Sequence, residues 1–377
     1  MNILLVGEYS RLHNSLKEGL VALGHKVVIL GFKDGFKDFP VDFPMFKIWD
    51  SGLKRKIKSG VFRLTGFDIS SYFTYRQFKR YQSQLQNFDV VQLINENSFL
   101  CTPQFEKKIL AFLFDNNKQT FLLSCGDDYL NVAYAFAHPT FKSPIQPYLM
   151  GKIRDQDFGN VLKFRHKSFK HLHEFIYNNI DGVIVSDLDY RFALEKHPKY
   201  LGLIANPINV TQIKFEPLII TDKVKIFLGI NTESYYKKGL DYFEEALKII
   251  EKTFEDRVEI IVTRNIPYQV YIQKYNSAHI VLDQVFANDQ GYNALEAMAK
   301  GKVVFTGAEN VFTDHYEIKE LVNVNAVADV SKIVEALSEL IENPTEIIEI
   351  GKRARTFIER EHHYKKIAQQ YLKTWRL

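Results

Sequence analysis

The sequence predicts an α/β protein made of two Rossmann-like domains that face each other across a cleft. A strand–helix–strand pattern opens the chain at residues 2–30, and a second alternating series of strands and helices begins at residue 224. The chain has 377 residues, which exceeds the usual size of a single hydrophobic core. Two domains are therefore expected, with ligands bound in the cleft at the carboxyl ends of the strands.

The first half is expected to contain a parallel sheet. Residues 2–6 form an apolar run that ends at Gly7, and residues 12–23 carry leucines at helical spacing before Gly24. Residues 26–30 are apolar again, and a strand, helix and strand of this length make a βαβ unit. Further strands are expected at residues 88–94, 120–124, 181–186 and 203–205, and a helix is expected at residues 104–116.

Two stretches of the first half are less regular. Residues 32–85 are rich in Phe, Tyr, Lys and Arg and show little periodicity, so we assign no element there. Residues 130–175 are aromatic and basic, and we expect them to be helical in part.

The turn signal Asn206-Pro-Ile-Asn209 marks the expected end of the first domain. We place a first Rossmann-like domain at residues 1–209 and a second at residues 210–361, followed by a final helix at about 362–377. The expected strands of the second half are 224–230, 258–263, 279–283 and 303–305. Its expected helices are 239–254, 268–276, 294–300, 331–341, 345–361 and 362–375.

Composition narrows the class of protein. A content of 46% hydrophobic and 25% charged residues is globular, and a net charge of +4 does not by itself indicate nucleic-acid binding. The two cysteines, Cys101 and Cys125, are too few for a disulfide framework and favour a reducing, cytoplasmic setting. No apolar run approaches the length of a membrane span, so we expect a protein that is soluble or peripherally bound.

The most informative segment is residues 291–307. Gly291 opens a helix that follows a strand, and such a helix presents free backbone N–H groups to an anion. Glu296 lies inside this helix among Leu295, Ala297 and Met298, where a carboxylate requires a partner such as paired hydroxyls. Phosphate at the helix end and ribose on the carboxylate would suit a nucleotide-sugar. The alternatives are an exposed helix face and an ordinary loop glycine.

Lys237 and Lys238 lie between a strand and a helix and could compensate a diphosphate. The sequence shows no metal-ligand cluster, since the histidines do not fit zinc spacing, so no metal is expected. Alone, the two lysines would more simply be solvated side chains at the start of a helix. Beside the 291–307 segment, we assign them to phosphate binding.

Two strand ends in the first half are candidates for the acceptor side. Gly7-Glu-Tyr9-Ser10 follows the first strand and should face the cleft, although a simple turn is an equal alternative. Asp127 and Asp128 end another strand, where they could bind hydroxyls or assist deprotonation of an acceptor. Their alternative role is helix capping. Cys125 has no supporting nucleophile motif and is expected to be a small buried residue.

A basic and aromatic run extends over Lys54–Arg80. Residues 53–80 hold eight Lys or Arg and one acid, Asp68, with Phe and Tyr interleaved. Such a face could lie on an anionic membrane surface. A polar surface with extended side chains, or a nucleic-acid site, are the alternatives.

The second half resembles the retaining glycosyltransferases of family 4 (glycosyl transferases group 1), which have the GT-B fold. Leu295-Glu-Ala-Met-Ala-Lys-Gly301 matches the family's L-E-A-M-A-x-G signature, and Lys237-Lys-Gly239 is similar to its K-G phosphate loop. The family's strand before the signature is similar to residues 278–283, and its domain-junction turn is similar to residues 206–209. Its closing helices are similar to residues 359–371. The resemblance implies that residues 1–209 bind the acceptor, that residues 210–361 bind the nucleotide-sugar donor, and that the C-terminal helix at about 362–377 crosses back and packs on the first domain.

The resemblance also implies roles for individual residues. The family has two glutamates eight positions apart, of which the second holds the ribose and corresponds to Glu296, whereas Asn288 stands at the first, sugar-contacting position. The predicted catalytic residues are Lys238, Asp127 and Asn288. The predicted donor-binding residues are Asn231, Lys237, Lys238, Asp289, Gly291, Tyr292 and Glu296. The predicted acceptor-side residues are Gly7, Tyr9 and Asp128.

The expected function is transfer of a sugar from a nucleotide-diphosphate donor to a glycan or lipid-linked acceptor. From the resemblance we expect a hexosyltransferase that acts with retention in bacterial surface polysaccharide assembly, in the cytoplasm or at the inner face of the membrane. Asn288 motivates an alternative, a non-catalytic nucleotide-sugar-binding homologue. An oxidoreductase is disfavoured because no G-x-G-x-x-G follows either opening strand.

Overall fold

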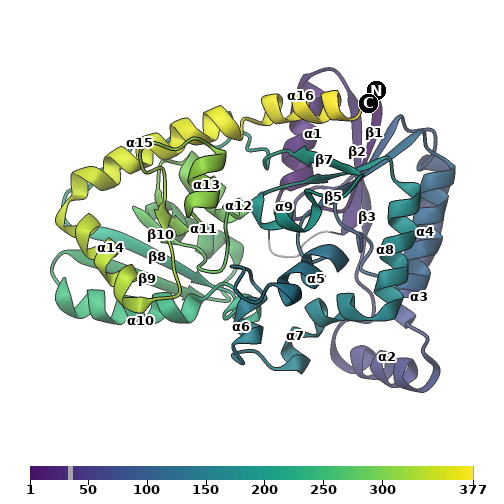
Figure 1. The fold of residues 1–377 in the computed structure, drawn as a ribbon, viewed down its shortest axis with the longest axis horizontal. Coiled ribbons are helices and arrows are strands. Elements are labelled where there is room, and N and C mark those ends of the chain that lie inside the picture. Colours follow the sequence, from purple (N-terminus) through teal and green to yellow (C-terminus); the bar gives the residue numbers. More distant parts are fainter. Residues whose placement is uncertain (33–36, 377) are drawn as a thin grey trace.

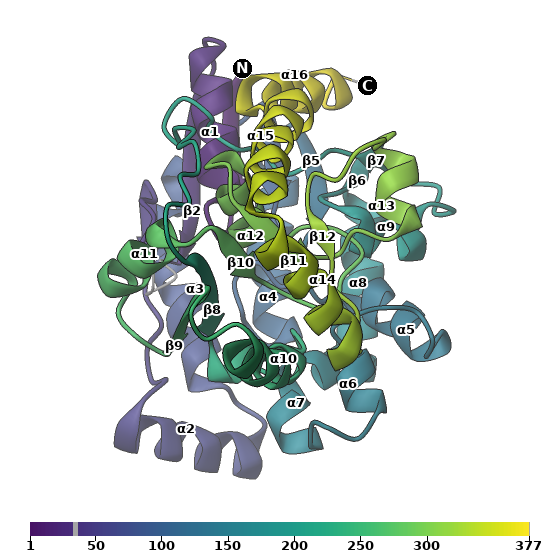
Figure 2. The same cartoon turned by 90° about the vertical axis from the view of Figure 1, so that its left-hand side faces the viewer.

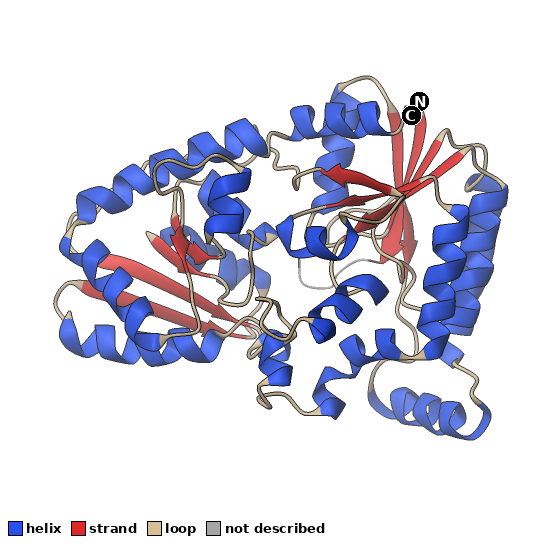
Figure 3. Ribbon diagram, in the orientation of Figure 1, coloured by secondary structure: helices blue, strands red, loops and turns tan. Residues whose placement is uncertain are grey.

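The computed structural model describes residues 1–32 and 37–376 and contains two parallel β-sheets flanked by helices (Figure 1; Figure 3). The strand order is β3-β2-β1-β4-β5-β6-β7 in the first sheet and β12-β11-β10-β8-β9 in the second. The sheets belong to two lobes, with the first half of the chain on the right of Figure 1 and the second half on the left. The predicted class, two Rossmann-like halves, is confirmed.

The first sheet is built on strands that are buried along their length. In β1, Leu4 pairs with Val28 of β2 and Val91 of β4, and residues 3–6 are fully buried. Near-continuous apolar strands are typical of parallel sheets, because helices cover their faces. The strands are β1 Asn2–Val6, β2 Lys26–Phe32, β3 Phe43–Met45, β4 Val90–Leu93, β5 Gln119–Ser124, β6 Gly182–Val185 and β7 Tyr200–Leu203.

The first half also contains elements that the sequence pattern did not resolve. Residues 37–85 contain β3, α2 and α3, whereas residues 33–36 lie outside the described part of the chain. Residues 130–175 contain parts of α5 to α8, which confirms the expectation of partial helix there. α2 escaped detection because none of its residues is buried, so no apolar face marks it. The helices are α1 Leu12–Ala22, α2 Gly52–Thr65, α3 Ile69–Tyr81, α4 Pro103–Asp115, α5 Tyr129–Ala137, α6 Gln146–Leu149, α7 Asp155–Leu162, α8 Lys167–Asn179 and α9 Leu188–Leu194.

The second half follows the predicted order of elements closely. Its strands are β8 Val224–Ile230, β9 Val258–Arg264, β10 Ile280–Leu282, β11 Val303–Thr306 and β12 Val324–Asn325. Its helices are α10 Leu240–Thr253, α11 Tyr268–Ser277, α12 Tyr292–Ala299, α13 Asn310–His315, α14 Val330–Glu342 and α15 Pro344–Glu361. β12 and α13 were not expected from the sequence.

The chain returns to the first lobe at its C-terminal end, as predicted. α15 runs along the second lobe, and α16 (Tyr364–Thr374) lies against α1, which Figures 1 and 2 show from two sides. The two helices approach so closely that a Cβ on Gly19 would lie 2.5 Å from the carbonyl oxygen of Tyr364. Beyond α16, the indole Nε1 of Trp375 donates to Gln92 Oε1 at 3.0 Å, which anchors the end of the chain in the first sheet.

The connection between the two sheets, residues 204–223, contains no helix and no strand longer than a single bridge. Ile208 pairs with His363, and the Arg355 guanidinium donates to the carbonyl oxygens of Val210 and Ile213. The predicted boundary at residues 209 and 210 falls within this connection. Within residues 1–32 and 37–376, no helix combines the length and the apolar character that a bilayer span requires.

Candidate functional site

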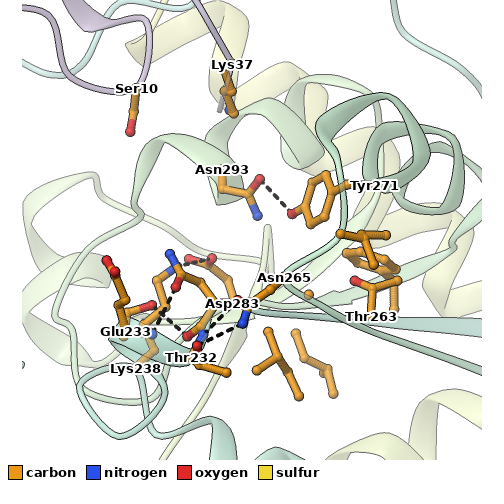
Figure 4. Close-up of a pocket in the computed structure, with 17 residues that line it drawn as sticks. Ser10, Lys37, Thr232, Glu233, Lys238, Thr263, Asn265, Tyr271, Asp283 and Asn293 are labelled. Carbon is orange, nitrogen blue, oxygen red and sulfur yellow. Dashed lines mark hydrogen bonds and ion pairs between the residues drawn. The ribbon is translucent and has the colours of Figure 1, made fainter. Parts of the chain in front are cut away.

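A pocket of about 560 Å³ opens at the carboxyl edge of the second sheet (Figure 4). Loop residues 231–234 after β8, Asn265 after β9 and Asp283 after β10 line it from the second half. Ser10 and Lys37 face it from the first half. The carboxyl ends of parallel strands are where α/β proteins place their ligands, so this is the candidate site.

An ion pair forms one wall of the pocket. Lys238 Nζ lies 2.9 Å from Asp283 Oδ1, and the Asp283 side chain is only 2% exposed. Asp283 Oδ2 is buried and has no hydrogen-bond partner among the residues that the structure describes. Lys238 thus brings a cation to the pocket with N–H donors to spare, while Asp283 offers an open acceptor. A phosphate and a hydroxyl group are the ligand chemistries that match.

The neighbouring Lys237 points in a different direction. Its Nζ lies 3.2 Å from Asp127 Oδ2, which follows β5 in the first half, and it stands 5.7 Å from the centre of the Phe158 ring. Two residues predicted for the donor and acceptor sides are therefore in direct contact. The two lysines therefore differ in position, since Lys238 lines the pocket and Lys237 forms an ion pair between the two lobes.

A second ion pair between the lobes adjoins the pocket. Lys37 Nζ lies 2.9 Å from Glu296 Oε2, and the two side chains are 10% and 11% exposed. Lys37 lines the pocket, whereas Glu296 lies behind it on α12. Sequence analysis missed Lys37, since nothing in its neighbourhood of the chain predicts a partner 259 residues away.

The rest of the wall combines neutral polar groups with one acid, Glu233, and with the apolar side chains of Phe227, Ile230, Ile266 and Leu282. Asn231 lines the pocket, and its side-chain oxygen caps the turn 232–234 by accepting from the N–H of Glu233 at 3.0 Å. Asn265 Nδ2 donates to Thr232 Oγ1 at 2.9 Å, and Tyr271 Oη donates to Asn293 Oδ1 at 3.2 Å. Apart from Asn231, sequence analysis missed these residues, and their position just after strand ends or at the start of a helix was the available signal.

The side chains of Asn288, Asp289 and Tyr292 face the first lobe rather than the pocket. Asn288 is 3% exposed, and its Nδ2 donates to the Lys142 carbonyl oxygen at 2.8 Å and to Asp189 Oδ1 at 2.9 Å. Asp289 Oδ2 accepts from the N–H of Leu188 at 3.1 Å. Tyr292 is buried, and its hydroxyl contacts Ser15 and the carbonyl oxygen of Pro207. None of the three predicted ligand residues is among the residues lining the pocket.

The carboxyl groups of this interface lie in a dry environment. Burial raises the pKa of Asp289 to about 7 and that of Asp189 to about 6. The pKa of Asp187 is also raised by burial and by the neighbouring Asp189. Carboxyls with such values would change charge near neutral pH, so we expect the contact between the lobes to depend on pH.

Gly291 sits at the N-terminal end of α12, beside the Lys238–Asp283 pair. A Cβ at Gly291 would lie 3.7 Å from Asp283 Oδ2, an ordinary contact, so packing does not require glycine there. The first turn of α12 nevertheless lies next to the open Asp283 oxygen, and Asn293 in that turn lines the pocket. The predicted convergence of Lys238 with the tip of this helix is therefore present, whereas Lys237 is directed to Asp127.

The predicted acceptor-side residues Gly7, Tyr9 and Asp128 each have a different structural role. Gly7 has a φ of +89°, and a Cβ there would lie 2.2 Å from Ile94 Cγ2, so only glycine fits this turn. Tyr9 is half-buried and packs against the core. Asp128 is 1% exposed and caps α5 by accepting from the N–H of Asn131 at 2.7 Å. Burial and the neighbouring Glu96 raise the pKa of Asp128 to about 7. Its contacts fit the capping alternative.

Comparison with known proteins agrees with this architecture. Residues 240–373, roughly a third of the chain, match a family model described as glycosyl transferase-like. Sucrose-phosphate synthase (tll1590) from Thermosynechococcus elongatus superposes with a TM-score of 0.63 at 14% identity, over 100% of this chain and 98% of that chain. No curated protein sequence matches the chain.

Two further solved structures are similar. HepE (Alr3699) from Anabaena, in complex with UDP and glucose, has a TM-score of 0.56 at 10% identity over 99% of both chains. TarM from S. aureus has a TM-score of 0.53 at 14% identity, over 80% of this chain and 59% of TarM. The protein therefore has the GT-B fold, and its C-terminal part is glycosyl transferase-like in sequence.

Proposed function

We propose that the protein is a glycosyltransferase that takes a sugar from a nucleoside-diphosphate donor bound in the pocket of Figure 4. The observation that carries this proposal is the Lys238–Asp283 pair at the carboxyl edge of the second sheet, with Lys37 opposite. The GT-B fold and the glycosyl transferase-like match over residues 240–373 support it.

The pocket's chemistry fits the parts of such a donor. Lys238 and Lys37 compensate the diphosphate charge, which makes a metal ion unnecessary in this proposal. Asp283 Oδ2 and the neutral groups of Asn265, Thr232 and Asn293 bind hydroxyl and base edges. Glu296 remains the proposed ribose ligand, and it is reached when the donor displaces Lys37 from the carboxylate or binds beside it.

In the proposed reaction, the bond between the anomeric carbon and the diphosphate oxygen breaks and the diphosphate leaves. The acceptor hydroxyl oxygen forms the new bond on the same face, with retention, and its proton passes to the departing phosphate or to Asp127. No enzyme nucleophile is needed. Lysine charges at the leaving group and closure of two lobes around the substrates supply the stabilisation.

The finer assignments are part of the same proposal. HepE was solved with UDP-glucose and TarM with UDP, so a UDP-hexose is the first donor to test. Membership of family 4 and a role in bacterial surface polysaccharide assembly belong to this proposal. The exposed basic helix α2 supports a cytoplasmic protein that contacts the inner face of the membrane.

One observation favours a second candidate, a nucleotide-sugar-binding protein without catalysis. Asn288 stands where a sugar-contacting glutamate was expected, and its amide is consumed by contacts with Asp189 and Lys142. The expected glutamate function is therefore absent from that position. Binding of a nucleoside diphosphate without transfer or hydrolysis would identify this alternative.

The decisive experiment is a thermal-shift screen against nucleoside diphosphates and their sugars, followed by a product assay with the best donor. A ligand present at about 100 times its Kd adds roughly 2.7 kcal/mol of stability, so a selective donor raises Tm measurably. We expect one nucleotide class to raise Tm, and the Lys238→Ala variant to lose the shift. Equal increases in Tm for the wild type and for Lys238→Ala would show that the nucleotide does not bind at the proposed site.

A further inference from the structure

A second pocket, of about 740 Å³, lies in the first lobe between α2, α3, the loop after β4 and the segment joining α7 to α8. We call it the α2–α8 pocket. Its lining mixes aromatic and aliphatic side chains with hydroxyl and amide groups, and includes Phe62, Phe99, Ser71, Asn160, Lys163 and Phe169. Neither the donor nor the proposed chemistry of the first pocket makes use of it.

The most unusual group in this pocket is the ammonium of Lys163. It is mostly buried, and its only hydrogen bond to residues 1–32 and 37–376 is donated to Asn97 Oδ1, a neutral amide oxygen, at 2.7 Å. The rings of Phe164 and Phe169 lie with their centres 4.9 and 5.4 Å from Nζ. No carboxylate in the described part of the chain forms an ion pair with it. Two of the three ammonium donors are left for a ligand.

Burial of this amine has an energetic consequence. It lowers the pKa of Lys163 below its ordinary value, although the charges of Glu106 and Asp127 act in the opposite direction. The carboxylate of Glu106 is separated from Lys163 by Asn97, whose Nδ2 donates to Glu106 Oε2 at 2.8 Å, so the ammonium has no direct anionic contact. A buried cation held in this way is stabilised further when an anion binds beside it. A site that retains such a cation is suited to an anionic ligand.

The carboxylates of the pocket are already engaged elsewhere. Asp50 pairs with Lys58 at 2.6 Å, and Asp68 caps α3 by accepting from the N–H of Ser71. Lys47 and His166 add further basic side chains to the lining. The pocket therefore presents an excess of positive charge around Lys163.

The pocket adjoins the place where the two lobes meet. α7 carries Phe158, over which Lys237 stands, and the same short segment continues to Asn160 and Lys163 in the pocket wall. Asp127, the ion-pair partner of Lys237, is close enough to influence the charge of Lys163. A molecule in the α2–α8 pocket would thus reach toward the donor side along α7.

The outer wall of the pocket is α2, which indicates the source of the ligand. α2 contributes Lys58 and Phe62 to the lining and protrudes at the lower edge of the molecule in Figures 1 and 2. It carries five Lys or Arg and no acid, and its Leu53 and Leu64 are 73% and 88% exposed. Apolar side chains interleaved with cations are typical of helices that lie on anionic bilayers.

We propose that the α2–α8 pocket binds the sugar acceptor, and that this acceptor is an amphiphile whose phosphate group contacts Lys163 while its apolar part extends along α2 toward a membrane. The identification of this ligand as the sugar acceptor rests on the proposed glycosyltransferase function. Binding of the amphiphile itself does not depend on the donor. Charge complementarity around Lys163 and the exposed apolar face of α2 carry it.

The test uses the full-length protein and a soluble probe, decyl phosphate, titrated calorimetrically below its micelle concentration. Decyl glucoside serves as the neutral amphiphile, and inorganic phosphate serves as the free anion. The variants are Lys163→Gln, Lys163→Arg and the matched control Lys167→Gln, which removes an exposed charge on α8 that does not line the pocket. UDP is titrated against every variant in parallel.

We expect Lys163→Gln to weaken decyl phosphate binding at least ~10-fold, the loss of one charged hydrogen bond. Lys163→Arg should restore most of the affinity, and Lys167→Gln should match the wild type. Neither UDP nor decyl glucoside binding should change. The Tm of Lys163→Gln should stay close to that of the wild type, since no direct ion pair is lost, whereas a purely structural role predicts a fall.

Three results would overturn the proposal. Wild-type affinity of Lys163→Gln for decyl phosphate would exclude Lys163 as the phosphate ligand. Equal affinity of the wild type for inorganic phosphate and decyl phosphate would show that the apolar part of the ligand does not contribute to binding, which excludes an amphiphile as the preferred ligand. Competition between UDP and decyl phosphate would place the probe in the donor pocket. Failure of UDP to bind, with decyl phosphate binding intact, would instead count against the proposed function and leave this pocket standing.

Discussion

The ammonium of Lys37 lies 2.9 Å from the carboxylate of Glu296, although 259 residues separate the two along the chain. The pair is about nine-tenths buried and links the two lobes at the edge of the candidate donor pocket. Removal of one partner of a nearly buried ion pair takes away the charge that the other one faces. Both residues should therefore affect nucleotide binding, in different ways.

Substitution of these two residues should separate phosphate from ribose recognition. Lys37→Gln should raise the Kd for UDP at least ~10-fold and change the Kd for uridine little, because only UDP carries the charge that Lys37 compensates. Glu296→Gln should raise the Kd for uridine and UDP by similar factors. Calorimetric titration of both ligands checks this, and equal losses on uridine in both variants would contradict the assignment.

The Lys237–Asp127 contact predicts a residue that acts on turnover rather than on donor binding. Asp127→Asn should lower kcat of sugar transfer by roughly 100-fold, the usual scale of a lost proton acceptor, with the Kd for UDP within about 2-fold. Asp115→Asn, an exposed acid at the end of α4, is the matched control. An Asp127→Asn variant with unchanged kcat would restrict this residue to holding the lobes together.

The interface between the lobes predicts a pH dependence of stability. The pKa of Asp289 is raised by burial from its ordinary value of 3.8 to about 7. Between these values the native state binds more protons than the unfolded state, so the free energy of unfolding contributed by Asp289 falls as pH rises. Asp289→Asn removes this pH-dependent contribution to the free energy of unfolding. Its Tm relative to the wild type should increase from about pH 4 to about pH 7 and then level off. A difference that is constant over this range would contradict the buried, protonated state.

The exposed face of α2 predicts membrane binding that depends on charge. Wild-type protein should co-sediment with vesicles that contain anionic phospholipid and much less with neutral vesicles, and added salt should release it. Leu53→Glu combined with Leu64→Glu should reduce binding at least ~10-fold. Leu321→Glu, at an exposed leucine in the other lobe, is the control. Equal binding of all three proteins would show that α2 does not contact the bilayer.

Sequence patterns predicted most of the fold because the elements of both sheets are buried and therefore periodic. β1, α1, β8 and α10 begin and end within a few residues of the expected positions. α2 could not be predicted, because an element without a buried face leaves no pattern of that kind. Its role, as proposed here, depends on exposed residues.

The candidate site was predictable only where its residues follow strand ends. Lys238 and Asn231 were identified in this way and line the pocket, and the same reasoning would have found Asp283. Lys37 and the partners of Asn288 depend on how the lobes approach each other. Such contacts over a long separation in sequence are not encoded in local periodicity.

The central claim is that a nucleoside diphosphate binds where Lys238 and Asp283 line the pocket, and calorimetric titration of UDP tests it most directly. Lys238→Ala should raise the Kd at least ~10-fold, since a charged hydrogen bond to phosphate is lost. The exposed Lys248→Ala variant on α10 should bind UDP as the wild type does. The same Kd for Lys238→Ala and the wild type would contradict the account.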